Sequence, residues 1–577
     1  MNEIFHTEQI AQMEISDEYS LSKSSENLES ESLTKQNGYN LDEVWGDSTY
    51  MDSFTSDYHI DQKLHQFANF ESLDDLYLDI ISPPIQSFDD EIINRGNGEF
   101  QDSEVVESEN KRLHVLPSTS LEILTKYGSR LRSLNRGKIN VERYRTDCNR
   151  NGSRTLSTET IIRLAAEEFI QSSSQSSCEL SVLSHPYASA ISGQVEEDFK
   201  ELKLLRNLLS CAEKVGEEKY ERARRLLLEC DKMSSSTGNP VERLAFYFIR
   251  ALYEKIDRET MKFKGKTLAD PQEVLKSPKT TQIAFHKLLP LSQIAKFAGF
   301  QAIVEHVEES RKIHIVDLQI NNGLQCTILM QALASRVEHP LEYLKITAVG
   351  TNSRPMIEET GRHLTSFAQS LSLKFLFNVV VVDDILDLNE KLFDLDEDET
   401  IAVYAEYVLM NWIARPNCLD KLMQLIRTLN PCVMIVCEVE ANCNSPIFVE
   451  RFVEALFFYG AFFDSLADCL KNDDENRMAA ESTNFSSAIR NIVATEGDER
   501  KIRHVSIDVW RAYFARFGLF EVELSMSSIY QANLVLKNFM CGDSCTLDTK
   551  DKSLVIGWKG TPLSSLSAWK FQRRCLY

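Results

Sequence analysis

Short apolar runs that alternate with helical segments restrict the fold of this 577-residue chain more than any other feature. The runs with the length and β-rich composition of buried strands are KIHIVDL (312–318), LKITAVG (344–350), LKFLFNVVVV (373–382), TIAVYAEYVL (400–409) and PCVMIVCEVE (431–440). Segments with apolar residues at helical spacing lie between them, at 325–336, 356–372 and 418–429. Strands that alternate with helices of this length predict an α/β fold with a parallel, Rossmann-like sheet.

Helical spacing dominates before this alternation begins. Residues 155–310 contain several amphipathic segments, and Asn239-Pro240 has the composition of a helix start. We therefore predict a mainly helical cap over 155–310 and an α/β core over 311–577. Near the end of the chain, 503–518 is predicted as a helix, and 531–539 and 546–571 are predicted as strands.

The acidity of the chain is concentrated in its first 110 residues. These contain 26 Asp and Glu against 4 Lys and Arg, a net charge of −22, whereas the remainder carries −2. The arm is rich in Ser and Asn and weakly periodic, so it cannot bury enough apolar surface to offset chain entropy, and we expect it to be disordered. A nearly neutral body lacks the Lys and Arg excess that tight non-specific DNA binding requires.

One segment of the arm interleaves acidic with apolar residues. The apolar positions of FANFESLDDLYLDII are Phe67, Phe70, Leu73, Leu76, Tyr77 and Leu78. This pattern is typical of an activation segment that enters a partner's groove as an amphipathic helix. A local helix that docks on the chain's own body is the alternative, and the sequence favours neither.

Residues 111–154 form a linker of opposite charge. Over 111–150 there are 10 Lys and Arg against 3 Asp and Glu. KRLHV and GSRLRSLNRGK could be read by nuclear import, or the linker could be a solvated basic stretch that pairs with the acidic arm.

The first predicted strand ends in the turn Asp317-Leu318-Gln319-Ile320-Asn321-Asn322-Gly323. Glycines in such a strand-to-helix turn let the backbone approach a bound cofactor. Methyltransferases that use S-adenosylmethionine would have glycines where Gln319 and Asn321 stand, and only Gly323 remains. We expect the side chains of Gln319 and Asn321 to fill the space of the cofactor. The strand at 344–350 also ends without the acidic residue expected to hold a ribose hydroxyl. The sequence therefore predicts no cofactor and no enzyme.

Two polar residues remain at this strand, His314 and Asp317. They could line a small-ligand pocket, but the favoured interpretation is that Asp317 bonds loop amides or caps the next helix, and that His314 packs in the sheet. Glu438 and Glu440 end another predicted strand, and a structural role is again the favoured interpretation.

The LRNLL stretch contains Leu205, Leu208 and Leu209 at LxxLL spacing. Such spacing suits a helix that lies in a partner's hydrophobic groove. The same spacing would hold the helix on its own core. We expect one or two of the three leucines to be buried, and the helix with its neighbours to bind a partner.

Other familiar chemistry is missing from the sequence. The 13 cysteines lack paired zinc-site spacing, so we predict reduced, mostly buried thiols and no metal. HExxH, P-loop and GxSxG motifs are absent, and so we predict no catalytic residues. With neither a signal-peptide pattern nor an apolar run of about 18 residues, we expect no membrane span.

Several motifs resemble those of the GRAS family of plant regulators. The stretch 313–325 resembles the VHIID motif, carried here by Ile313, His314, Ile315, Val316 and Asp317. The segments that follow the family's order are LLRNLLSCAEKVGEEKYERARRLL with NPVERLAFYFIRAL for the first leucine-rich region, 426–466 and 489–518 for the PFYRE region, and Ser567, Ala568 and Trp569 for the closing SAW motif.

This resemblance implies a methyltransferase-like core with an α-helical cap. It also implies a nuclear transcriptional regulator that acts through other GRAS proteins, as homo- or heterodimers, and through DNA-binding transcription factors, with DNA contacted mostly indirectly. The body resembles the DELLA side of the family, but the arm has no DELLA or TVHYNP stretch, which argues against degradation through the gibberellin receptor. Hormone, developmental and root-symbiosis pathways all fit. A small-molecule-binding module or a residual methyltransferase is the alternative.

Overall fold

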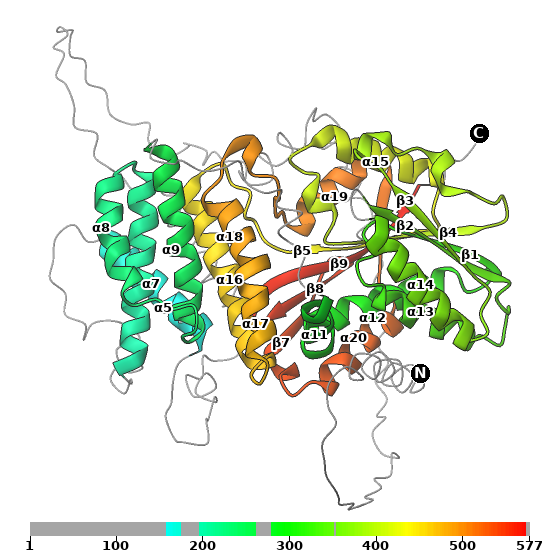
Figure 1. The fold of residues 1–577 in the computed structure, drawn as a ribbon, viewed down its shortest axis with the longest axis horizontal. Coiled ribbons are helices and arrows are strands. Elements are labelled where there is room, and N and C mark those ends of the chain that lie inside the picture. Colours follow the sequence, from blue (N-terminus) through cyan, green and yellow to red (C-terminus); the bar gives the residue numbers. More distant parts are fainter. Residues whose placement is uncertain (1–156, 175–195, 261–278, 351–353, 573–577) are drawn as a thin grey trace, which may run out of the picture.

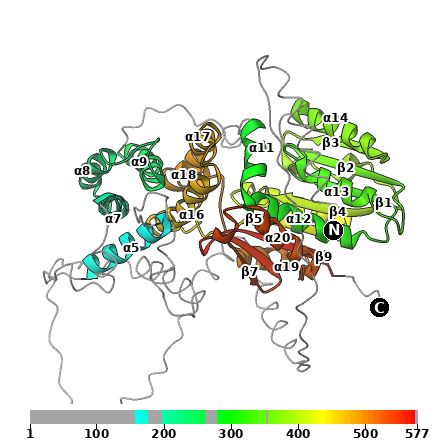
Figure 2. The same cartoon turned by 90° about the horizontal axis from the view of Figure 1, so that it is seen from below.

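The computed structural model describes residues 157–174, 196–260, 279–350 and 354–572. The acidic arm, including Phe67, Phe70, Leu73, Leu76, Tyr77 and Leu78, and the basic linker lie outside these ranges. The described residues form a helical cap at one end and a sheet with helices on both faces at the other (Figures 1 and 2).

The sheet begins with five parallel strands in the order β3-β2-β1-β4-β5. Their bounds are β1 Lys312–Asp317, β2 Tyr343–Gly350, β3 Phe375–Val381, β4 Thr400–Glu406 and β5 Val433–Val439. Beyond β5 the sheet continues antiparallel with β9, β8 and β7, and β6 also pairs with β9. Their bounds are β6 Leu519–Val522, β7 Cys545–Lys550, β8 Ser553–Trp558 and β9 Thr561–Phe571. The 3-2-1-4-5 order is Rossmann-like, which confirms the predicted fold class.

Helices cover both faces of this sheet (Figure 1). On one face lie α12 Pro290–His306, α13 Leu324–Ala334, α14 Arg354–Ser370 and α20 Met526–Asn538. On the other lie α15 Pro416–Leu429, α19 Ile507–Arg516 and the short helices η4 Ile385–Asp387 and η5 Glu390–Phe393. Because both faces are covered, central strands such as β5 are buried along their length, which explains their mostly apolar sequence.

The cap is assembled from two distant segments of the chain. The first supplies α5 Thr158–Ser174, α7 Glu196–Gly216, α8 Tyr220–Asp231 and α9 Pro240–Glu259. The second supplies α16 Phe448–Cys469, α17 Asp474–Ala480 and α18 Ser486–Val493. Helices α16 and α18 pack on α9, whereas α12, which follows α11 Lys279–Leu288, packs on the sheet. The cap therefore includes α16–α18, which lie after the predicted boundary at 310, whereas α12, which lies before this boundary, packs with the core.

Local signals and buried ion pairs hold the two cap segments together. Asn239 caps α9, with its side chain accepting the backbone N–H of Glu242 at 3.0 Å, and Pro240 occupies the first turn, as the sequence predicted. On the same helix, the Arg243 guanidinium lies 3.0 Å from the Glu481 carboxylate of the second segment, and both side chains are buried. A buried charge needs its partner, so this pair fixes the two segments against each other.

The strand predicted at 531–539 is wrong, because these residues belong to α20. Ser525 caps this helix by accepting the backbone N–H of Ser528 at 3.0 Å. The buried positions Ser528, Gln531, Ala532 and Val535 have the spacing of one helical face, which packs on α12. Read alone, 531–539 is short and apolar enough for a strand, and the helical period becomes clear only when the residues from 526 are included.

Among the helices described, none is long and apolar enough to cross a membrane. The cysteines in the described ranges are free, and most are buried.

Candidate functional site

The turn after β1 is closed by its own side chains. Asp317 ends β1, and its Oδ1 accepts the backbone N–H of Gln319 at 2.9 Å. The amide of Gln325, in the first turn of α13, donates to Asp317 Oδ2 at 3.2 Å and to the carbonyl of Ile320 at 2.9 Å. Asp317 therefore bonds the loop, as the favoured interpretation of the sequence held.

Helix α14 covers this turn from outside. Thr360 donates its hydroxyl hydrogen bond to the carbonyl of Asn321 at 3.0 Å. Gly323 has a φ of 73°, and a Cβ there would lie 2.7 Å from the Thr360 methyl group, so only glycine fits. Helix α14 is thus packed directly against the turn.

Gln319 and Asn321 are both exposed, and the expectation that their side chains fill the cofactor space stays a prediction. Asp317, Leu318, Ile320 and Gly323 are the buried residues of the turn, and Ile320 joins the large core cluster. Gln325, at the start of α13, is buried as well. Two adjacent residues of a tight turn point in different directions, and the sequence does not say which one faces inward.

Buried polar groups gather at the adjoining edge of the sheet. The pKa of Asp317 is raised to about 7, mainly by burial and to a smaller extent by the Glu406 carboxylate. The hydrogen bonds from Gln319 and Gln325 oppose this shift. Lys296 on α12 lies 4.0 Å from Glu406 at the end of β4. The ring of Tyr404 packs against Phe300 with centroids 4.6 Å apart. These side chains form a buried layer at this edge of the sheet.

Glu438 and Glu440 at the end of β5 hold neighbouring loops. Glu438 Oε1 accepts the backbone N–H of Leu409 at 2.7 Å, and Glu440 Oε2 accepts that of Ile507 at 2.7 Å. Burial raises the pKa of Glu438 to about 8, although the surrounding backbone N–H groups oppose this shift. Both carboxyls thus act as structural groups.

His314, in the VHIID-like strand Ile313, His314, Ile315, Val316 and Asp317, is fully buried. Its Nδ1 lies 3.0 Å from Glu399 Oε2 and its Nε2 lies 2.7 Å from Thr347 Oγ1. Burial lowers the pKa of His314 to about 4, so the ring is neutral near pH 7. Lys345 also binds Glu399, at 2.5 Å. This network ties the loop before β4 to the sheet.

The SAW-like residues Ser567, Ala568 and Trp569 form the seam between β9 and β5. Ser567 faces Val436 in the register, and Trp569 faces Met434. The Trp569 indole donates to Ser567 Oγ at 2.8 Å, and its ring meets Phe514 edge-on at 4.8 Å. The motif therefore joins the antiparallel part of the sheet to the parallel part.

The LxxLL leucines are all buried, which corrects the expectation that one or two would be. Leu205 and Leu208 are 0% exposed and Leu209 is 2% exposed. Helix α7 packs on α5, α8 and α9 together, so the leucine face meets helices on more than one side. The solvent-facing residues of α7 include Glu197, Phe199, Lys200, Lys203 and Arg206.

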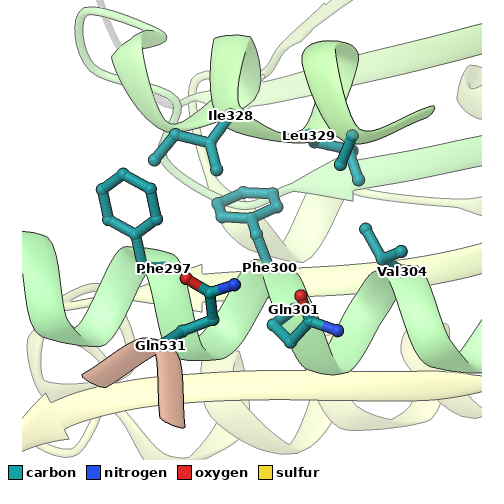
Figure 3. A pocket seen from close by; sticks show the side chains of 8 residues that line it. Phe297, Phe300, Gln301, Val304, Ile328, Leu329 and Gln531 are labelled. Atoms are coloured by element: carbon teal, nitrogen blue, oxygen red, sulfur yellow. The ribbon is translucent and has the colours of Figure 1, made fainter. Parts of the chain in front are cut away.

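A small cavity between α12, α13 and α20 was not anticipated from the sequence (Figure 3). Its volume of 10 Å³ is on the scale of a single water. Gln531 faces the ring of Phe300 there, and neither atom of its buried amide has a hydrogen-bond partner in the described part of the chain. Gln531 was missed from the sequence, because 531–539 was predicted as a strand and not as part of a helix that faces α12.

These features define a Rossmann-like α/β protein with a helical cap and a closed first turn. The GRAS domain family matches residues 204–570, and the chain belongs to this family of plant regulators. It is 33% identical over 373 residues to DELLA protein RGL3 of Arabidopsis thaliana, covering 64% of this chain and 69% of the relative. It is 31% identical over 381 residues to DELLA protein 2 of Medicago truncatula, covering 65% and 69%.

A solved structure from the same family has a similar fold. The crystal structure of SCL7 in Oryza sativa superposes with a TM-score of 0.56 at 28% identity, covering 64% of this chain and 99% of that one.

Proposed function

We propose that this chain is a nuclear transcriptional regulator that acts by binding proteins, namely other GRAS proteins and DNA-binding transcription factors, and that it is not an enzyme. The observation that carries the proposal is the closed turn after β1 in a member of a regulator family. Because this turn is closed, the core serves as a rigid scaffold, and partner proteins bind on the surface of the domain. DNA is contacted mostly through the partner, since the chain beyond the arm has a net charge of only −2.

The outer face of α7 and α8 is the partner surface that we favour, in place of the buried leucines. It lies at the end of the molecule away from the sheet (Figures 1 and 2). Phe199 on α7 is 52% exposed and Leu228 on α8 is 55% exposed. Lys203, Arg206 and Arg222 on the same helices are also exposed. Acidic residues of these helices, among them Glu197, Glu221 and Glu229, are exposed as well. Large apolar side chains among charges of both signs suit a partner surface with apolar residues and complementary charges.

Affinity purification from plant nuclei tests this assignment. We expect the unmodified chain to capture other GRAS proteins, and a Phe199→Ser, Leu228→Ser double variant to lose them. Leu376→Ser is the matched control, because this leucine is similarly exposed at 49% but lies on β3 at the far edge of the sheet. If the double variant keeps the same partners as the control, the surface is wrong; if no regulator is captured at all, the proposed function is wrong.

The acidic arm carries the second part of the proposal. Fused to a heterologous DNA-binding domain, residues 1–110 should drive a reporter gene. Replacing Phe67, Phe70, Leu76 and Tyr77 with Ala should abolish that activity, because the acidic residues alone offer no apolar contact. Full activity in the variant would show that the segment is only a spacer.

The enzyme alternative is tested by calorimetry. We expect no heat of binding when S-adenosylmethionine is titrated into the purified chain, because Ile320, Gln325 and Thr360 occupy the approach to the turn. Micromolar binding would overturn the scaffold proposal.

A further inference from the structure

Two cysteines meet where the end of α16 touches the turn after α20. Cys469 is the last residue of α16, and Cys541 immediately precedes the short helix η9 Gly542–Ser544. They are 72 residues apart in sequence, and their Sγ atoms lie 3.0 Å from each other. Both are partly exposed, whereas most cysteines in the described ranges are buried.

The Sγ separation places the thiols close to bonding distance. A disulfide bond is about 2.05 Å long, so small side-chain rotations would bring the sulfurs together. The described ranges contain no group of three or more His, Cys, Asp or Glu side chains placed to hold a metal ion. The pair therefore has the geometry of a dithiol and not of a metal site.

The two thiols differ in their readiness to react. The hydrogen bond between the two thiols lowers the pKa of Cys541 and raises the pKa of Cys469. The thiolate is the nucleophile in thiol chemistry. Cys541, beside the fully exposed Met540, is thus the attacking group, and Cys469 is the thiol that completes the bond.

The pair also sits at a joint between the cap and the sheet. Helix α16 packs on the cap helices α5 and α9 and on strands β8 and β9. Close to Cys469, Asp464 accepts the Trp558 indole N–H at 2.6 Å and lies 2.7 Å from Lys559 Nζ, at the tip of the β8–β9 hairpin. A disulfide bond between Cys469 and Cys541 would add a covalent link to a joint that is otherwise held by non-covalent contacts.

We propose that Cys541 and Cys469 form a reversible thiol-oxidation site whose co-reactant is a small disulfide such as oxidised glutathione. The Cys541 thiolate attacks one sulfur of the glutathione disulfide, which breaks the S–S bond and releases one glutathione thiolate. Cys469 then loses its proton and attacks the Cys541 sulfur of the mixed disulfide, releasing the second glutathione. Two protein thiols are oxidised and one glutathione disulfide is reduced to two thiols, so atoms and electrons balance.

A second cysteine pair in the cap provides an internal control. Cys211 and Cys230 are hydrogen bonded to each other, but both are 0% exposed. A dissolved disulfide can reach them only when the cap unfolds. Reaction at 469–541 without reaction at 211–230 is therefore the signature of a site in the folded protein.

The test uses the full chain, reduced and then equilibrated in buffers of increasing oxidised-to-reduced glutathione ratio. Non-reducing digestion and mass spectrometry should find a peptide pair linked through Cys469 and Cys541, with no Cys211–Cys230 link. Cys469→Ser should accumulate glutathione on Cys541, and Cys541→Ser should abolish reaction at Cys469. The melting temperature should rise on oxidation of the unmodified chain, since the link closes a long loop, and should not rise in either variant.

Three outcomes would overturn the proposal. The first is no 469–541 link even in fully oxidised glutathione. The second is a link that appears only together with Cys211–Cys230, which marks reaction of unfolded chains. The third is a Cys541–Cys545 link in its place, because Cys545 begins β7 only four residues further on. None of these outcomes bears on the proposed regulatory function.

Discussion

Replacing Leu208 with Ala should unfold the cap before it affects any partner directly. Leu208 is 0% exposed on α7, inside the cluster that joins the cap helices. Full burial of a Leu side chain is worth about 1.5–3 kcal/mol. The residual cavity adds to this loss, so we expect Leu208→Ala to lower the free energy of unfolding by about 2–5 kcal/mol.

The matched control is Leu228→Ala on α8, which changes the same side chain at a position that is 55% exposed. It leaves no enclosed cavity and removes only part of the burial, so it should cost no more than about 1 kcal/mol. Both variants are compared by urea unfolding followed by circular dichroism, because the cap is helical.

Partner capture is then measured at a temperature where every variant stays folded. There, Leu228→Ala should weaken partner binding, and Leu208→Ala should not. If Leu208→Ala melts like Leu228→Ala but loses partners, then Leu208 faces a partner and the argument from burial fails.

Two further predictions concern the core. Gly323→Ala should lower the free energy of unfolding in urea by about 1–3 kcal/mol more than the control Gly518→Ala. The two glycines have similar φ values of 73° and 76°, but only a Cβ at 323 would meet Thr360. Equal losses in the two variants would mean that α14 does not close the turn. Glu438 has a pKa raised from 4.5 to about 8, so between these values the folded state holds a proton that the unfolded chain has lost, and stability falls as the pH rises through this window. Glu438→Gln should therefore show a smaller drop in melting temperature between about pH 5 and pH 8.5 than the unmodified chain, and an unchanged drop would remove Glu438 as its source.

The α/β core was predictable because its strands obey a simple rule. Each central strand is buried on both faces, so β1, β4 and β5 are mostly apolar runs separated by helices. The antiparallel strands β7–β9 were also found, because tight turns separate them. Periodicity failed at α20, where a window of nine residues was too short to tell a helix from a strand.

The packing of segments that are far apart in the sequence could not be predicted. Helix α16 is apolar around most of its surface, so its sequence does not tell which body it packs on. The Arg243–Glu481 pair joins residues 238 positions apart, and no local pattern marks it. The same limit applies to the site: the spacing of Leu205, Leu208 and Leu209 defines a helical face but not whether that face meets a partner or the core.

The closed turn explains how a cofactor fold can serve as a scaffold. In a cofactor site, part of the hydrogen bonding of the turn comes from the ligand. Here the Gln319 backbone N–H and the Gln325 amide satisfy both oxygens of Asp317, so the turn is complete without a ligand. Removing Gln325 would leave a buried carboxyl with a pKa already raised to about 7, which would take up a proton more readily than it would bind a cofactor. Ile320 would still be buried in the core, and Thr360 would still donate to the Asn321 carbonyl. A single substitution should therefore not restore a cofactor site, because the turn is closed from inside by the Asp317–Gln325 bond and from outside by α14.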